Sequence, residues 1–157
     1  MSGSGTIVAV DDEDMVVRSL RMYLELETPY NVLTYTSTTE ALKYIAANDV
    51  DLVVSDYLMP EMDGLKFLAE VKKLKPEVPR VLLTGYADKE NAIKAINEIG
   101  LYQYIEKPWN NEDLRIILRN GIEKKQLLEQ LQQKMAEIDK AHRELQGIQK
   151  EVLKAFA

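Results

Sequence analysis

The stretch Asp51-Leu52-Val53-Val54-Ser55-Asp56 decides the fold of this chain. Its middle is apolar at successive positions, not at alternate ones, and it has the length and composition of a β-strand. A strand with this pattern is covered on both faces, which is typical of a parallel sheet held between two layers of helices. The stretch ends on a carboxylate, so an acidic side chain stands where the predicted strand leaves the sheet.

Four more apolar runs of strand length alternate with helix-like segments along the chain. We predict strands over residues 6–10, 31–36, 51–55, 80–84 and 101–106, and helices over 14–27, 38–48, 65–74, 89–99 and from 111 onward. Ser37 (with Glu40 three residues later) and Asp88 each predict a helix start, and Gly100 predicts a helix end. The alternation predicts an α/β fold with a five-stranded parallel doubly wound sheet, consistent with the flavodoxin-like order 2-1-3-4-5, and a long C-terminal helix.

The composition excludes several classes of chemistry. The chain has 157 residues, of which 46% are hydrophobic and 29% charged, and it has no cysteine. Disulfides, cysteine-based metal sites and a thiol nucleophile are therefore excluded, and a reducing compartment fits. The one histidine, His142, lacks the neighbours that a catalytic triad or a two-histidine metal site needs. No run approaches the roughly 18 apolar residues of a membrane span, and the N-terminus does not resemble a signal peptide, so we expect a cytoplasmic protein without membrane contact.

Negative charge is concentrated in the first two thirds of the chain. Residues 1–110 hold 11 Lys and Arg against 18 Asp and Glu, whereas residues 111–157 hold 9 against 8. An acidic domain repels phosphate backbones, which argues against direct binding of nucleic acid by these residues. The same excess of acid suggests that a cation is bound somewhere in this part of the chain.

Polar side chains suited to one reaction follow four of the five predicted strands. Asp11 and Asp12 follow the first strand, Asp56 ends the third, Thr84 ends the fourth, and Lys107 follows the fifth. Ligands of open α/β sheets bind at this edge, and the first and third strands are neighbours in the predicted order. Carboxylates gathered there would repel one another unless a divalent cation, best Mg²⁺, lay between them. Together with an ammonium and a hydroxyl, they describe a place where a carboxylate accepts a phosphoryl group.

Four segments in this order resemble the receiver domains of two-component response regulators. They are Val8-Ala9-Val10-Asp11-Asp12-Glu13, Ser55-Asp56-Tyr57-Leu58-Met59-Pro60-Glu61-Met62-Asp63-Gly64, Leu83-Thr84-Gly85-Tyr86-Ala87 and Tyr104-Ile105-Glu106-Lys107-Pro108-Trp109. The resemblance covers about residues 5–120. Any one of these segments alone would be a weak signal, whereas four with the right order and spacing are a specific one.

The resemblance implies a role for each residue at the strand ends. Asp56 would be the phosphoacceptor, and Asp12, Asp56 and the backbone carbonyl of Leu58 would ligate Mg²⁺ directly. Asp11 would act on the ion largely through water. Thr84 and Lys107 would hold the phosphoryl oxygens. The resemblance further implies that Tyr104 turns inward when Thr84 moves, that the Lys107–Pro108 peptide bond is cis, and that a sensor histidine kinase supplies the phosphoryl group.

A heptad pattern runs through the end of the chain. Its a positions are Leu128, Met135, His142, Gln149 and Phe156, and its d positions are Leu131, Ile138, Leu145 and Val152. An apolar stripe of this length needs a partner, so we predict a parallel homodimeric coiled coil through residues 128–156. Lys134 at a g position would then face Asp139 at an e position of the other chain. The rival interpretation is a single amphipathic helix that folds back on its own domain.

These features predict three segments: a tag-like flexible start over residues 1–5, a receiver domain over 6–120 and a coiled-coil helix over 121–157 that leads to an output domain absent from this chain. The predicted function is a phosphorylated regulatory switch and not an enzyme, beyond catalysis of its own phosphorylation and dephosphorylation. One alternative is a Mg²⁺-dependent phosphatase of the aspartyl-phosphate kind, although Leu58 stands where that class carries a second acid. The other alternative is a coiled-coil adaptor that is never phosphorylated.

Overall fold

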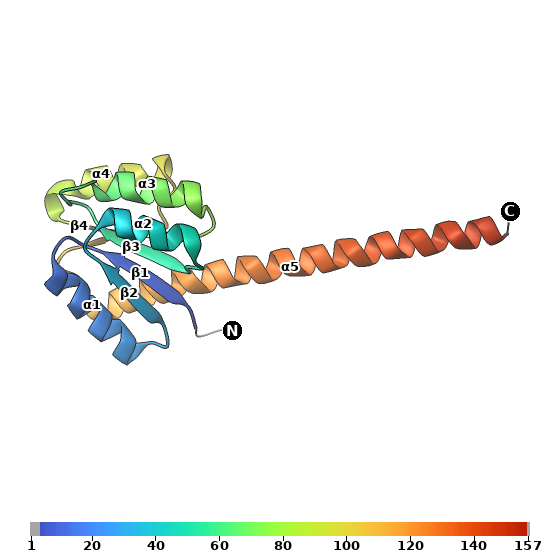
Figure 1. Ribbon diagram of the computed structural model, residues 1–157, viewed down its shortest axis with the longest axis horizontal. Coiled ribbons are helices and arrows are strands. Elements are labelled where there is room, and N and C mark those ends of the chain that lie inside the picture. Colours follow the sequence, from blue (N-terminus) through green and yellow to red (C-terminus); the bar gives the residue numbers. More distant parts are fainter. Residues whose placement is uncertain (1–3, 157) are drawn as a thin grey trace. The chain divides into compact units, whose positions relative to one another are not determined.

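The computed structural model describes residues 4–156, and residues 4–125 form a compact unit in which strands and helices alternate. Figure 1 shows these elements along the chain. The strands are β1 (Thr6–Val10), β2 (Asn31–Tyr35), β3 (Leu52–Asp56), β4 (Arg80–Thr84) and β5 (Gln103–Glu106). The helices are α1 (Asp14–Glu27), α2 (Thr38–Ala47), α3 (Gly64–Leu74), η1 (Tyr86–Asp88), α4 (Lys89–Glu98) and α5 (Asn111–Ala155).

The five strands form one parallel sheet in the order β2-β1-β3-β4-β5. The predicted α/β fold, the flavodoxin-like doubly wound order and the long C-terminal helix are therefore confirmed. The strand order reverses between β1 and β3, where Val10 pairs with Ser55. This register places the residues that follow β1 directly beside the end of β3.

Two hydrophobic cores cover the two faces of the sheet, with α1 and the start of α5 on one face and α2, α3 and α4 on the other. In Figure 1, α1 and the group of α2, α3 and α4 lie on opposite sides of the strands. Strand β3 contributes Leu52 and Val54 to the first core and Val53 to the second, and every residue of this strand is buried. Because side chains alternate between the faces of a strand, burial on both faces produces the unbroken apolar run seen in the sequence.

The helix ends lie at the three residues predicted from the sequence. The Ser37 Oγ accepts a hydrogen bond from the backbone N–H of Glu40 at 3.4 Å and so caps α2. Gly100 follows α4 with a φ of +67°, the left-handed conformation that glycine adopts at little cost. Asp88 is the N-cap residue of α4, as predicted, although its side chain makes no capping hydrogen bond. Residues 86–88 form the 3₁₀ turn η1 that runs directly into α4, so Asp88 already belongs to a helical turn.

The first four turns of α5 belong to the compact unit. Leu114, Leu118 and Ile122 are fully buried in the first core, and Lys125 forms an ion pair with Asp51 at 3.2 Å. Asp51 also accepts a hydrogen bond from the backbone N–H of Thr6 at 2.8 Å. Asp51 therefore links α5 to the first residue of β1 and to the residue that precedes β3.

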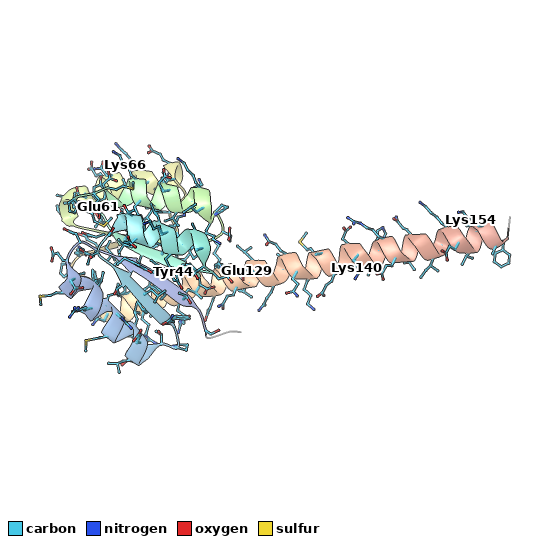
Figure 2. All side chains as sticks on the ribbon, in the orientation of Figure 1. Tyr44, Glu61, Lys66, Glu129, Lys140 and Lys154 are labelled. Atoms are coloured by element: carbon cyan, nitrogen blue, oxygen red, sulfur yellow. The ribbon has the colours of Figure 1, made fainter. Side chains whose placement is uncertain are left out.

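The second unit begins at Gln126, and the structure describes it as far as Phe156, with residues 126–155 belonging to α5. Large apolar side chains between Leu127 and Phe156 are exposed in this segment, and Figure 2 shows side chains projecting all round the helix from Glu129 to Lys154. Among residues 4–156, no helix combines the length and the apolar character that crossing a membrane requires.

The predicted flexible start falls mostly outside the described part of the chain. Residues 1–3 are not described. The backbone carbonyl of Gly5 accepts a hydrogen bond from the N–H of Asn31 at 2.9 Å, which extends the pairing of β1 with β2 by one residue.

Candidate functional site

The sheet brings the polar residues at its carboxyl edge together. Asp11 follows β1 directly, Asp56 is the last residue of β3, Thr84 is the last residue of β4, and Lys107 follows β5. Oxygen atoms of Asp11, Asp12 and Asp56 all lie within 4.8 Å of one another. The carboxylates therefore meet as the sequence predicted, at the edge where open α/β sheets bind their ligands.

The three carboxylates differ in their access to solvent. Asp11 is 1% exposed and Asp56 is 8% exposed, whereas Asp12 is exposed. Carboxylates this close disfavour one another's charged forms, and burial weakens the screening by water that would relieve the repulsion. Oxygen donors in this arrangement are the ligands that hard divalent cations take. The cluster is therefore able to hold a metal ion.

Lys107 supplies the positive charge of the site. Its Nζ lies 2.6 Å from Asp56 Oδ1 and 3.7 Å from Asp11 Oδ2. Burial disfavours the charged form of this lysine, but the hydrogen bond and the charge of Asp56, together with the charge of Asp11, outweigh it and raise the pKa of Lys107. The backbone N–H of Lys107 donates to the carbonyl of Thr84 at 2.8 Å, and the Lys107–Pro108 peptide bond is cis, as the resemblance implied. The ammonium is thus held against the carboxylate that ends β3.

Asp11 is the member of the cluster whose charged form is disfavoured by its surroundings. Its Oδ1 accepts a hydrogen bond from the backbone N–H of Glu13 at 2.9 Å, whereas its Oδ2 is buried without a hydrogen-bond partner among the described residues. The pKa of Asp11 is raised to about 6, chiefly by burial and then by the charge of Asp56, against the lowering effects of the Glu13 N–H and of Lys107. A buried carboxylate oxygen with no donor is the place where a cation or its water would be stabilised most.

Thr84 and Tyr104 lie on neighbouring strands at the other side of the cluster. Thr84 is fully buried, and its Oγ1 donates to the carbonyl of Gly85 at 3.2 Å. Tyr104 pairs with Leu82 in the sheet and packs, partly buried, against the core on the α2, α3 and α4 face. The structure therefore brings Asp11, Asp12, Asp56 and Lys107 into one cluster and leaves Tyr104 outside it.

Leu58 lies in the loop between β3 and α3, two residues after Asp56. Its side chain is 64% exposed. The position carries no second acid, so a carboxylate that could protonate a leaving group does not stand here. Any contribution of Leu58 to the cluster has to come from its backbone.

Gly64, for which the sequence analysis predicted no role, shapes this loop. A Cβ atom at this position would stand 2.1 Å from the carbonyl oxygen of Asp56 and 3.0 Å from a methyl group of Leu82. The backbone N–H of Gly64 donates to the carbonyl of Tyr57 at 2.7 Å, which closes the loop directly over the end of β3. A glycine at the first position of a helix, directly after the capping residue Asp63, was the signal that could have revealed this close approach.

We predict that Asp11→Asn stabilises the protein at neutral pH in buffer without divalent cations. The carboxyl is ionised more readily in the unfolded chain, with a pKa near 3.8, than in the fold, with a pKa of about 6, so it lowers stability progressively as the pH rises from about 4 to about 6. Asparagine keeps the acceptor for the Glu13 N–H and removes the charge. The free energy of unfolding from urea titration should exceed that of the wild type by on the order of 1–3 kcal/mol at pH 7.

The difference should shrink toward zero at pH 4, where the Asp11 carboxyl is protonated or nearly so in the fold. Asp63→Asn is the control, because this exposed helix cap lies outside the cluster and asparagine caps equally well. A variant Asp11→Asn that is no more stable at pH 7 than at pH 4, relative to wild type, contradicts the electrostatic account of the cluster.

Comparison with known proteins places this geometry in a family. The model of the response regulator receiver domain matches residues 7–119. The chain is 38% identical over 118 residues to the hydrogenase transcriptional regulatory protein HoxA of Cupriavidus necator, which covers 75% of this chain and 24% of HoxA. It is 32% identical over 145 residues to the regulatory protein AtoC of Escherichia coli, which covers 92% of this chain and 30% of AtoC. The chain thus spans less than a third of the length of either regulator.

A solved structure agrees with the sequence matches. The crystal structure of a response regulator receiver domain protein from Clostridium thermocellum superposes with a TM-score of 0.74 at 36% identity, covering 79% of this chain and 98% of that one. The matched region contains the sheet, its two layers of helices and the cluster of Asp11, Asp12, Asp56 and Lys107. This chain belongs to the family of response regulator receiver domains.

Proposed function

We propose that this receiver domain is a switch that accepts a phosphoryl group on Asp56 from a phosphohistidine of a sensor histidine kinase. Receiver domains are regulatory and interact with histidine kinases. The role of Asp56 as the phosphoacceptor is what we propose beyond this. The observation that carries it is the 2.6 Å contact of Lys107 Nζ with Asp56 Oδ1 beside two further carboxylates. An Asp56 oxygen forms the new bond to phosphorus, the bond from phosphorus to the imidazole nitrogen breaks, and the imidazole leaves with a proton from solvent.

The donor set supports Mg²⁺ as the cation of the site. Asp12, Asp56 and the backbone carbonyl of Leu58 would hold the ion directly, and Asp11 would act on it through water. The buried Oδ2 of Asp11, which accepts no hydrogen bond from the described residues, fits this assignment, because the ion's water would supply the missing donor. When bound, Mg²⁺ supplies positive charge to the non-bridging oxygens of the phosphoryl group as the reaction proceeds.

Lys107 and Thr84 would hold the remaining phosphoryl oxygens. The ammonium already contacts Asp56 and has only to exchange a carboxylate oxygen for a phosphoryl oxygen. The hydroxyl of Thr84 donates to a carbonyl next to it in the chain, an interaction that it can give up. Movement of Thr84 toward the phosphoryl group would free space for Tyr104 to turn inward, so that the surface of α4 and β5 changes. Phosphorylation then shifts a population between two pre-existing states.

Two alternative functions are less well supported. A phosphatase of the aspartyl-phosphate kind needs a second acid two residues after its nucleophile, and that position is Leu58. A coiled-coil adaptor that is never phosphorylated would have no use for a buried carboxylate cluster beside an ammonium, which costs free energy. We place the protein in the cytoplasm, where a histidine kinase domain and its ATP would be, with no direct contact to membrane or nucleic acid.

The segment after Lys125 is proposed to be a parallel homodimeric coiled coil through residues 128–156. The seam residues Leu131, Ile138 and Leu145 are 55%, 68% and 54% exposed in the single chain, and an isolated helix with such a stripe gains free energy when a second copy covers it. The proposed domain organisation is a receiver followed by this helix, which leads to an output domain outside the chain.

We predict that incubation with Mg²⁺ and a small acyl phosphate adds one phosphoryl group to the wild-type protein and none to Asp56→Asn. Asparagine is nearly isosteric but cannot form the acyl phosphate under these conditions. Intact-protein mass spectrometry reads the added mass directly. The matched control is Asp63→Asn, which removes an acidic group of the same loop and should label like the wild type. Full labelling of the Asp56→Asn variant would show that another residue is the acceptor.

We predict that the full chain is a dimer in multi-angle light scattering and that a chain ending at Lys125 is a monomer. The truncation has to spare Ile122 and Lys125, because both are buried parts of the receiver unit. Within the full chain, Ile138→Lys should give a monomer because it places a charge in the seam. Ala136→Lys, two residues away on the outer face of the helix, should stay dimeric. A full chain with the mass of one copy would disprove the coiled coil.

A further inference from the structure

Two exposed apolar side chains of α5 lie next to the predicted heptad seam but at neither its a nor its d positions. Leu127 and Ile148 are 64% and 58% exposed, which is as exposed as the seam residue Leu131 at 55%. Each of the two directly precedes an a position of the heptad, Leu128 and Gln149. A seam built only on the predicted a and d positions leaves these side chains in water, although they are among the larger apolar groups of the segment.

The helix carries three parallel rows of residues at heptad spacing. The shared row is the set of d positions, Leu131, Ile138, Leu145 and Val152. The first flank is the set of predicted a positions, Leu128, Met135, His142, Gln149 and Phe156. The second flank consists of the residues one position earlier, Leu127, Lys134, Ala141, Ile148 and Ala155. Either flank alternates with the shared row in steps of three and four, so either combination satisfies the geometry of a two-stranded seam.

We propose that the dimeric helix has two alternative seams, one made with the first flank and one with the second, and that phosphorylation of the receiver shifts the population between them. This inference rests on the dimer and on the phosphoacceptor of the proposed function. Successive residues lie about 100° apart around a helix, so the two flanks stand on opposite sides of the shared row. A turn of each helix by roughly 50° about its own axis exchanges one seam for the other.

Neither seam is strong enough to exclude the other. The first flank contains the polar residues His142 and Gln149, and polar groups in a seam weaken it. The second flank contains the charge of Lys134 and the small Ala141, whose methyl group buries little area. Because both seams share the strongly apolar row and each carries a defect in its flank, their free energies lie close together. A switch needs such a pair of states.

Charge complementarity in the first seam identifies a second copy of this chain as the partner. In the first seam, Lys134 occupies a g position and faces Asp139 at an e position of the other copy. In the second seam, Glu137 occupies a g position and faces His142 at an e position of the other copy. The opposite charges of Lys134 and Asp139 favour a parallel alignment without stagger in the first seam, and the imidazole of His142 offers Glu137 a hydrogen-bond donor at the matching positions of the second seam.

The absence of cysteine from the chain makes the test direct, since single cysteines report which row lies in the seam. Leu145→Cys probes the shared row, Gln149→Cys the first flank and Ile148→Cys the second flank. A disulfide forms only where the two Cα atoms come within about 7 Å, which paired core positions reach and positions flanking the seam do not. Full-length protein is oxidised before and after phosphorylation by an acyl phosphate with Mg²⁺, and the cross-linked fraction is read on non-reducing gels.

The proposal requires that Leu145→Cys cross-links strongly in both states. It requires that both flank probes cross-link, and that phosphorylation changes their yields in opposite directions by at least twofold. Adding His142→Leu should raise the yield of the Gln149→Cys probe, and adding Ala141→Leu should raise that of the Ile148→Cys probe, because each repairs the defect of one flank. The same yields in the Asp56→Asn background should not respond to the phosphoryl donor.

Failures of the different claims are distinguishable. No cross-link at Leu145→Cys would disprove the parallel dimer of the proposed function. A strong Leu145→Cys cross-link with only one flank probe reacting in both states leaves the dimer standing and overturns the two-seam proposal. Two reactive flank probes whose ratio phosphorylation leaves unchanged overturn it as well.

Discussion

Three carboxylates within 4.8 Å of one another, beside a single ammonium, are an arrangement of charges that costs free energy, and this repulsion determines the chemistry of the receiver domain. Asp11 shows the cost most clearly, with a pKa raised to about 6 and one oxygen without a hydrogen-bond partner among the described residues. Lys107 offsets part of the repulsion through its 2.6 Å contact with Asp56. The fold holds these groups together because they stand at the ends of strands that the two hydrophobic cores fix in place. Binding of a cation would relieve this repulsion, so it would raise the free energy of unfolding of the domain.

The fold and most of the cluster follow from the sequence because their causes are local. The apolar run Leu52–Val54 identified a strand buried on both faces. The alternation of strands and helices predicted a parallel doubly wound sheet and was consistent with the order that the structure establishes. Once β1 and β3 are neighbours, the meeting of Asp11 and Asp56 requires only that parallel strands end at the same edge. The contact of Lys107 with Asp56 follows in the same way from the position of β5, two strands away.

Features that depend on packing between distant segments could not be predicted. The 2.1 Å approach of a Cβ at Gly64 to the carbonyl of Asp56 arises from how the loop folds over β3, and the sequence shows only a glycine after an aspartate. The buried pair of Lys125 and Asp51 joins residues far apart in the chain, and neither belongs to a recognisable pattern. The missing capping hydrogen bond of Asp88 could not be predicted either, since it accompanies a 3₁₀ turn that runs directly into α4. In each case the deciding atoms belong to another element.

The proposals for the acidic cluster and for the exposed rows of α5 share one requirement. Each needs two states that lie close in free energy. In the proposed switch, repulsion in the cluster would keep the domain responsive to an added cation or phosphoryl group, and imperfect flanks would keep the dimeric helix responsive to the domain. α5 is one helix from Asn111 to Ala155, and its first turns are anchored by Leu114, Leu118 and Ile122 in the core of the receiver. In the proposed switch, α5 is the element that would carry a change at the site to the seam.

Calorimetric titration of the unphosphorylated protein with Mg²⁺ tests the central claim most directly. The account predicts saturable binding of one ion per chain, loss of that binding in Asp12→Asn, and unchanged binding in Asp63→Asn, whose side chain lies outside the cluster. Absence of saturable binding by the wild type, or equal affinity in the Asp12→Asn variant, would contradict the claim that the carboxylates at the ends of β1 and β3 form a magnesium site.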